Sequence, residues 1–517
     1  MTNGQRLQNG REFQSLPALE VPHLLSPLVP HCTFQEQLRT ELLRSYPDPA
    51  NDLRPWAEAL QAVWFADLDF AEPLLTAAYS DLGRPNLYSP KDLLRCLLLC
   101  QQRACRSLTL WVAQLRREPV LGILCGFPPG QVPAVGTLYA FLDRLYPRPQ
   151  ALRAKGILRP HRRLAKPKRG QKLPANRKKL ARMARWLTTH LQQPPAPTPA
   201  EVWDQLLNQT VGQSIERQIL PNPASLHAAA DGSLLRSGAH SYGRKRCDCP
   251  RGCSCNRYFS DPTARVGFDS TNNCFVLGYS AYTLSDTDSG HHLPLALSLA
   301  PANRHDGVSL LGLLTSARRL LPQCGAAITT VSADSAHDHD AIYTFCIDLG
   351  ANPLIDRKGK LPAPSASLRA RLTPADLSLS PEGRPRCAHG FLHSSGYSRP
   401  GTRQFQCPKP DPRGCPCTDC PLHDGHRFTL DIRDQPRLLA PNPKAEPAAR
   451  KAYKRRTSVE RTFSLLTSSS ALDTARHRRA YVWHGRLAIT ALLAHFRVWA
   501  KTATAPVVDW LRAWALR

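Results

Sequence analysis

The sequence predicts an α/β protein in which a mixed β-sheet is flanked by helices, preceded by a helical N-terminal domain and interrupted by a Cys/Pro-rich insertion. Three observations predict this class. Apolar residues recur at helical spacing before residue 150, Val, Tyr, Phe and Leu alternate as in strands after residue 225, and helices and strands then alternate. Residues 357–450 break the alternation, because they hold 15 of the 47 prolines and five cysteines.

The composition excludes several classes of protein. The chain has 517 residues and a formal net charge of +28, and its 42% of hydrophobic residues are enough for a core, which excludes wholesale disorder. No uninterrupted run of about 18 apolar residues occurs, so the sequence predicts no membrane span. The polar N-terminus predicts no secretion signal, so we expect a cytoplasmic protein whose 17 cysteines are thiols or metal ligands.

Residues 1–150 predict the helical N-terminal domain. Ser89 and Pro90 suit a helix start, because Ser accepts a bond from the first turn and Pro fits the first helical position. Leucines follow at helical spacing from Leu93 to Leu99, and residues 135–145 predict another short helix.

Residues 151–224 predict a basic segment, a Pro-rich linker and a helix. Between residues 153 and 185 the chain carries 14 Lys or Arg, among them Lys166, Lys168 and Arg169, and no Asp or Glu. A partner with dense negative charge explains this best, and nucleic acid is the commonest such partner. The alternative is a solvated basic linker.

Residues 225–356 predict the first part of the core. We expect strands at 226–230, 274–284, 293–299, 327–333 and 352–355, and helices at 306–321 and 338–349. Asp231 and Asp334 each follow an apolar strand. Because an α/β sheet presents its site at strand ends and an unpaired carboxylate is costly to bury, we expect the two to converge on a cation or a basic partner. The alternative for each is an aspartate in a turn or at a helix N-cap.

Residues 451–517 return to helical character. In the segment YKRRTSVE (453–460), Tyr453, Arg456 and Glu460 are spaced three and four apart, so one helix would present them on one face. Such a face suits two tasks, since Glu460 completes an oxygen cage for Mg²⁺ while Arg456 and Tyr453 hold a phosphate. The alternative is an exposed helix whose Arg456–Glu460 pair adds only about 0.2–0.5 kcal/mol.

Together these motifs resemble those of the DDE transposases of bacterial insertion sequences, in the subgroup with a Tyr-x2-Arg-x3-Glu-x6-Lys signature. The matching segments are DGS (231–233), PANRHD (301–306), ADSAHD (333–338) and YKRRTSVER (453–461). The helical part at 88–145 also resembles the domain that precedes the catalytic core in such proteins. The chain departs from the pattern at Thr467, where Lys or Arg is expected, and at His337, where many relatives carry Tyr.

The resemblance implies an RNase H-like core with a central five-stranded mixed sheet. Asp231 would lie on its first strand, Asp334 on its fourth, and Glu460 on a helix after the insertion. These three carboxylates would be catalytic and would hold two Mg²⁺ or Mn²⁺ ions, while Arg461, with Tyr453 and Arg456, would contact DNA phosphate.

The implied activity is a DNA transposase that binds transposon ends, cuts them and joins the freed 3′-OH to target DNA by two-metal phosphoryl transfer. Its partners would be double-stranded DNA, as terminal repeats bound by residues 1–150 and as target, and a second copy in a homodimer on paired ends. The setting would be a prokaryotic nucleoid. Two alternatives stay open: a catalytically inactive, repurposed transposase that binds DNA, and an RNase H-like nuclease without strand transfer.

Two cysteine clusters predict structural zinc. The stronger lies in the Pro-rich insertion, which has little apolar material and needs a staple, with Cys387 and His389 upstream of Cys407, Cys415, Cys417, Cys420 and His423. The other lies between the first two strands and consists of Cys247, Cys249, Cys253 and Cys255. Its C-x-C spacing is tighter than the usual C-x2-C, so free thiols or ligands shared with another segment are alternatives.

Overall fold

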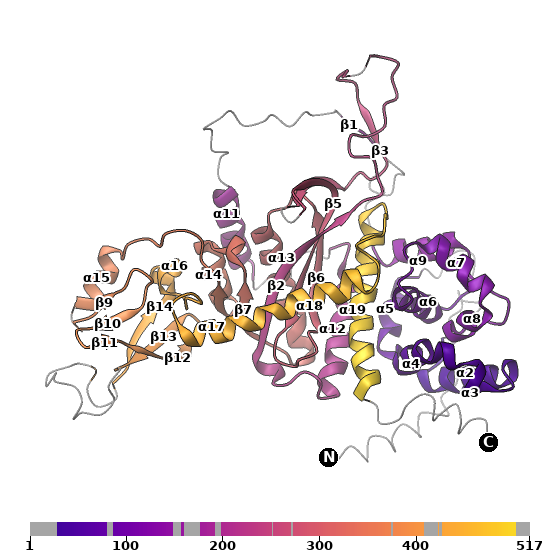
Figure 1. The fold of residues 1–517 in the computed structure, drawn as a ribbon, viewed down its shortest axis with the longest axis horizontal. Helices are drawn as coiled ribbons and strands as arrows, with labels where there is room; N and C mark the ends of the chain where they lie inside the picture. Colours follow the sequence, from indigo (N-terminus) through magenta and orange to yellow (C-terminus); the bar gives the residue numbers. More distant parts are fainter. Residues whose placement is uncertain are drawn as a thin grey trace.

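The computed structural model describes residues 28–79, 86–147, 157–159, 176–191, 198–250, 252–269, 272–373, 376–407, 422 and 426–502. At 157–159 and 176–178 only the backbone is described. A central mixed sheet lies between a helical N-terminal unit and a smaller unit formed by the insertion (Figure 1). The α/β class with a mixed sheet is therefore confirmed.

The N-terminal unit is helical, as predicted. Pro90 opens α6 directly after Ser89, and Ser107 caps α7 by accepting a hydrogen bond from the Leu110 N–H at 3.1 Å. Its helices are α2 (His31–Ser45), α3 (Pro49–Asp52), α4 (Ala57–Phe65), α5 (Glu72–Ala77), α6 (Pro90–Gln102), α7 (Leu108–Arg117), α8 (Pro119–Cys125) and α9 (Val135–Arg144). Along the chain, this unit is followed by α11 (Asn176–Thr189) and α12 (Glu201–Glu216), which precede the sheet.

In the described part of the chain, the central sheet has six strands, one more than the resemblance implied. They are β2 (Leu226–Arg236), β4 (Arg265–Asp269), β5 (Cys274–Asp286), β6 (Pro294–Pro301), β7 (Ile328–Ala333) and β8 (Asn352–Ile355). The order is β4-β5-β2-β7-β8, and β6 also pairs with β5. The pairs β2–β5, β4–β5 and β5–β6 are antiparallel, whereas β2–β7 and β7–β8 are parallel. The extra strand is β4, which was not predicted and pairs with the part of β5 that β6 does not reach.

One predicted strand end was wrong, because β2 does not stop at Asp231 but continues to Arg236. The long strand β5 pairs with β2 as far as Arg236 opposite Gly278. On its other side β2 is paired only up to Ala230, which lies opposite the last residue of β7, Ala333. Asp231 is therefore the position at which β2 loses its parallel neighbour, so its side chain is placed at an opening of the sheet.

Helices cover both faces of the sheet. Figure 1 shows α18 (Thr457–Phe463) in front of the sheet and α13 (Asp306–Leu320) behind it. The helix α14 (Asp340–Asp348) contacts the edge strand β8. The helix α19 (Ala480–Thr502) contacts the strand β6 and also the N-terminal helices α4, α6 and α9.

A buried arginine fastens the N-terminal unit to α19. Arg486 is 1% exposed, and its Nε donates to Gln101 Oε1 at 2.6 Å. Its two terminal nitrogens donate to the carbonyl oxygens of Cys105 at 2.5 Å and Arg106 at 3.2 Å. A buried guanidinium with several acceptors fixes the two units in one relative position.

The insertion is more regular than the loop-rich unit that the sequence predicted. In its described residues it forms two small antiparallel sheets, whose short strands carry many exposed polar residues and show no apolar alternation. Their strands are β9 (Ser378–Leu379), β10 (Pro385–Cys387), β11 (Gly390–Phe391), β12 (His393–Arg399), β13 (Thr402–Gln406) and β14 (Phe428–Asp431), with α15 (Ala366–Leu372), α16 (Pro436–Leu439) and α17 (Pro447–Tyr453). Arg437 anchors the unit to the core by donating to both oxygens of Asp338, at 2.9 and 2.6 Å.

In the part of the chain that the structure describes, no helix is both long and apolar enough to cross a membrane.

Candidate active site

Three predicted carboxylates belong to neighbouring elements. Asp231 lies on β2, and Asp334 directly follows the adjacent parallel strand β7. Glu460 lies on α18, which packs against β2 and β5. Arg456 connects two of them, because its Nη1 lies 3.3 Å from Asp231 Oδ2 and its Nη2 lies 2.5 Å from Glu460 Oε1.

The segment that carries Tyr453, Arg456 and Glu460 is not one regular α-helix. The helix α17 ends at Tyr453, residues 454–456 form a 3₁₀ turn, and α18 begins at Thr457. The backbone stays right-handed helical throughout, so the expected shared face survives. The Arg456 guanidinium carbon lies 5.8 Å from the centre of the Tyr453 ring.

The two aspartates carry opposite pKa shifts. Burial raises the pKa of Asp231, and the nearby charge of Asp334 raises it further, against the Gly232 N–H and Arg456. Burial alone would also raise the pKa of Asp334, but His337, the Ala336 N–H and Arg456 together outweigh it and hold that pKa below its usual value. Neighbouring carboxylates whose pKa values are shifted in opposite directions are typical of sites that concentrate negative charge.

A buried chain of hydrogen bonds holds Asp334, and the sequence did not predict it. His337 is 1% exposed, and its Nδ1 lies 2.6 Å from Asp334 Oδ1. Its Nε2 is hydrogen-bonded to the hydroxyl of Tyr282, which is equally buried. Burial and the negative charges of Asp306, Asp231 and Asp334 raise the pKa of Tyr282 well above its usual value, so its hydroxyl keeps its proton. His337 therefore links the Tyr282 hydroxyl to the Asp334 carboxylate through its two ring nitrogens.

The glycine of the DGS motif makes room for Tyr282. Gly232 lies opposite Tyr282 in the β2–β5 ladder, and a Cβ at residue 232 would meet the Tyr282 ring at 2.7 Å. Because successive side chains of a strand point to opposite faces, Asp231 and Tyr282 approach the site from different sides of the sheet. A glycine inside a strand beside an acidic residue was the signal that could have identified this close approach.

Asp306 is a fourth acidic residue near the site that the sequence did not assign to it. It is the first residue of α13, and burial raises its pKa, with Asp334 adding to the shift and the histidines 337 and 305 opposing it. The motif PANRHD contains Asp306, so the signal was present in the sequence, but its proximity to Asp334 follows only from the packing of α13 behind the sheet.

Two further residues of the signature region contact other parts of the protein. The Nη1 atom of Arg461 lies 3.0 Å from His292 Nε2, and Arg461 is not paired with Asp231, Asp334 or Glu460. Thr467 is 7% exposed in a π-helical turn, Ser464–Ser468, and its hydroxyl donates to the Phe463 carbonyl at 2.8 Å. A basic residue at 467 would therefore point into the core, which explains why threonine fits this position.

The four cysteines of the 247–255 cluster come together, with all their sulfur atoms within 4.8 Å of one another. Of the other cluster, Cys407 and Cys387 are described and half-buried, whereas Cys415, Cys417, Cys420 and His423 lie outside the described residues. Lys166, Lys168 and Arg169 of the basic segment also lie outside them.

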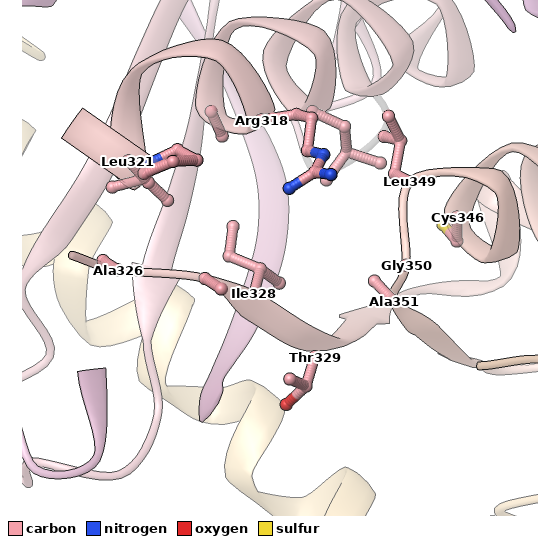
Figure 2. Close-up of a pocket in the computed structure, with 13 residues that line it drawn as sticks. Arg318, Leu321, Ala326, Ile328, Thr329, Cys346, Leu349, Gly350 and Ala351 are labelled. Atoms are coloured by element: carbon pink, nitrogen blue, oxygen red, sulfur yellow. The ribbon is translucent and has the colours of Figure 1, made fainter. Parts of the chain in front are cut away.

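A cavity of about 150 Å³ lies apart from the carboxylates. Figure 2 shows its lining, with Ile328 and Thr329 at the beginning of β7 and Leu349 and Gly350 beyond α14. Asp334 follows the opposite end of β7, and the lining is mostly apolar. The cavity therefore contributes nothing to the acidic site.

Comparison with known families identifies the class of the protein. Residues 267–494 match the family model described as a transposase DDE domain, and residues 52–144 match the one described as a transposase domain (DUF772). The first match includes Asp334 and Glu460 but begins after Asp231. No curated protein matches the chain. Two transposase domains in the expected order make the protein a transposase. The chain belongs to the DDE transposases of the insertion-sequence type.

Proposed function

We propose that this transposase cuts the ends of its element and joins each freed 3′-OH to target DNA, with Asp231, Asp334 and Glu460 as the metal-binding carboxylates. The observation that carries the proposal is the position of Arg456. Its guanidinium lies between Asp231 and Glu460, which are far apart in the sequence, and occupies the point where their negative charges meet. Metal-assisted phosphoryl transfer requires carboxylates that converge on a bound cation, and Arg456 occupies such a position beside Asp334.

We assign the core to the RNase H-like class. The strand order supports this, since β2 is central, β5 and β6 follow it antiparallel, and β7 and β8 lie parallel on its other side. Asp231 then belongs to the first strand of that core and Asp334 follows its fourth. In this assignment β4 is an addition, and the insertion at 357–450 separates the fifth strand from α18.

The donor set fits Mg²⁺ or Mn²⁺. Carboxylate oxygens are hard ligands that these ions prefer, and the Asp334 and Glu460 side chains are 41% and 53% exposed, so solvent and substrate can reach them. Two bound ions would supply activation of the attacking oxygen and stabilisation of the leaving 3′ oxygen.

The residues around the carboxylates have distinct roles in this proposal. His337 and Tyr282 fix the orientation of Asp334 through their hydrogen bonds. Arg456 balances Asp231 and Glu460 before substrate binds, and with Tyr453 it is placed to hold a DNA phosphate once the carboxylates are otherwise neutralised. Arg461, which lies farther out on α18, would contact the DNA backbone away from the reacting bond.

We further propose that different predicted domains of the chain bind different parts of the DNA. Residues 1–150 would bind the transposon ends, the basic part of residues 151–224 would follow the DNA backbone, and two copies of the chain would act on paired ends. The core is split into residues 225–356 and 451–517 by the insertion. The excess of basic charge over residues 153–185 supports this assignment.

Cleavage of a DNA duplex that carries the ends flanking this gene tests the proposal. We expect Mg²⁺-dependent nicking at the ends by the wild type, and a loss of about a hundredfold or more in Asp334→Asn and Glu460→Gln, since several kcal/mol of charge stabilisation disappear. Both variants should still bind the duplex. Asp473→Asn, a change of an exposed carboxylate on the same C-terminal segment, is the matched control and should cleave normally.

Three outcomes would contradict the proposal. Normal cleavage by Asp334→Asn would show that the site is elsewhere. Well-folded wild type that binds the ends without cutting them would favour a repurposed DNA-binding protein, and nicking without joining would favour a nuclease.

A further inference from the structure

We propose that Cys247, Cys249, Cys253 and Cys255 form a structural Zn²⁺ site that holds together a basic arm projecting from the central sheet. The arm consists of residues 238–264, between β2 and β4. Nothing in the transposase chemistry above depends on this site, so the two proposals can fail separately.

The arm leaves the sheet on a narrow stem. Its strand β3 (Arg257–Phe259) pairs with β1 (Ile157–Arg159), and Figure 1 shows both strands beyond the edge of the sheet. Arg244 and Tyr258 exchange two backbone hydrogen bonds, of 2.7 and 2.9 Å, and so close the loop that carries the four cysteines. The loop therefore has a defined base but lies away from the protein core.

The sulfur positions match tetrahedral zinc. Cys247 Sγ lies 3.5 Å from Cys253 Sγ, and Cys249 Sγ lies 3.7 Å from Cys255 Sγ. A tetrahedron with Zn–S bonds of about 2.3 Å places its sulfurs about 3.8 Å apart. Both separations are far longer than a disulfide bond of about 2.05 Å, and all four thiols are free.

A tight turn lets all four cysteines of this short loop reach one metal ion. The Cys253 N–H donates to the Pro250 carbonyl at 3.4 Å, and Gly252 has a φ of +95°, which other residues rarely adopt. The turn folds the second C-x-C pair back beside the first. Within each C-x-C pair the cysteines are two residues apart, so in an extended chain both side chains point the same way.

The arm buries too little apolar area to form a hydrophobic core of its own, so a bound metal would stabilise it. In its described residues, the buried apolar side chains are Phe259, Pro262 and Ala264, while Tyr242 is 68% exposed. Short loops with so little buried apolar area are stabilised by metals or disulfides. A metal bound by the native loop alone stabilises it in proportion to its binding free energy.

The chemistry of the loop selects zinc over magnesium. Thiolates are soft ligands, which Zn²⁺ accepts and Mg²⁺ avoids. Four thiolates around one Zn²⁺ leave two negative charges, and Arg244, Lys245 and Arg246 adjoin them in the chain. The Arg246 guanidinium also lies 4.5 Å from the centre of the Tyr258 ring, so the cations are held close to the loop.

Zinc content of the full-length protein is the first test. We expect Cys247→Ser/Cys253→Ser to contain one zinc fewer per chain than the wild type, by elemental mass spectrometry. Cys274→Ser, which removes a half-buried cysteine on β5, is the matched control and should contain as much zinc as the wild type. The variant Cys415→Ser/Cys420→Ser measures how much of the zinc is bound by the insertion instead of by the arm. Equal zinc in Cys247→Ser/Cys253→Ser and Cys274→Ser would overturn the proposal, as would disulfides linking the four cysteines in unreduced protein.

A second test uses the wild type and so does not depend on how a variant folds. Trypsin should cleave the arm after Arg244, Lys245 or Arg246 faster once a chelator has removed the metal, and added Zn²⁺ but not Mg²⁺ should restore protection. If chelation leaves cleavage in the arm unchanged, no zinc holds it.

Discussion

Acidification should weaken the packing of α19, because burial lowers the pKa of three histidines on it or against it, His477, His484 and His495. His495 is fully buried, with its Nε2 at 3.0 Å from the Pro294 carbonyl and its Nδ1 at 2.8 Å from the Ser214 hydroxyl. Because Nε2 faces a carbonyl oxygen and must donate to it, Nδ1 of a neutral His495 accepts from the Ser214 hydroxyl, which itself accepts from Trp499 Nε1 at 2.8 Å. A proton on His495 Nδ1 would break this arrangement. Burial accordingly lowers the pKa of His495 to about 4.

His477 adds a second group of the same kind. Burial and the charge of Arg486 lower its pKa to about 3. In the unfolded chain both imidazoles have a pKa of about 6.5. Because the native pKa values are depressed, the native state is fully stabilised above about pH 6.5 and loses stability as the pH falls from there towards the native values. At about pH 5 each histidine lowers the free energy of unfolding by about 2 kcal/mol, and the two together by about 4 kcal/mol.

Urea unfolding at about pH 7.5 and about pH 5 measures this loss, with tryptophan fluorescence as the signal because Trp483 and Trp499 lie on α19. In His495→Gln the loss between the two pH values should be smaller by about 2 kcal/mol, since the amide cannot titrate. His393→Gln changes an exposed histidine on β12 and should behave as the wild type. The same loss in His495→Gln as in the wild type would refute the reasoning.

Three substitutions probe other contacts. Arg486→Met should lower the free energy of unfolding by about 3–5 kcal/mol in urea, because Gln101 and two carbonyls lose their donor, and a loss below about 1 kcal/mol would mean that water replaces it. Tyr282→Phe should raise the Mg²⁺ concentration for half-maximal cleavage about tenfold or more, because His337 loses its partner, and an unchanged metal requirement would rule out a positioning role. Arg456→Lys should slow cleavage about tenfold, since an ammonium cannot bridge two carboxylates as a guanidinium does; equal rates would mean that charge alone matters.

Local patterns predicted most of the core. The strand at 352–355 is β8 as predicted, and the helices predicted at 306–321 and 338–349 are α13 and α14 within two residues. Asp231 and Asp334 are close, as expected, because the two apolar strands that precede them pair in parallel.

The remaining features depend on partners that are distant in the sequence. The extension of β2 beyond Asp231 follows from the length of β5, and the role of Tyr282 follows from the register that sets it opposite Gly232. Neither leaves a periodic signal in its own segment. The four cysteines were visible, but a turn at Gly252 decides whether their sulfurs meet. The strands of the insertion were missed because they are short and exposed.

The connection between Arg456 and Asp231 spans 225 positions of the chain. During synthesis, a growing polypeptide therefore has β2 and β7 long before it has α18, and α19, which secures the N-terminal unit, follows later still. A chain that stops within the insertion has two of the three carboxylates and lacks Arg456 and Arg486. In the proposed assignment, such a chain cannot assemble the acidic site, because Glu460 and Arg456 are both missing from it.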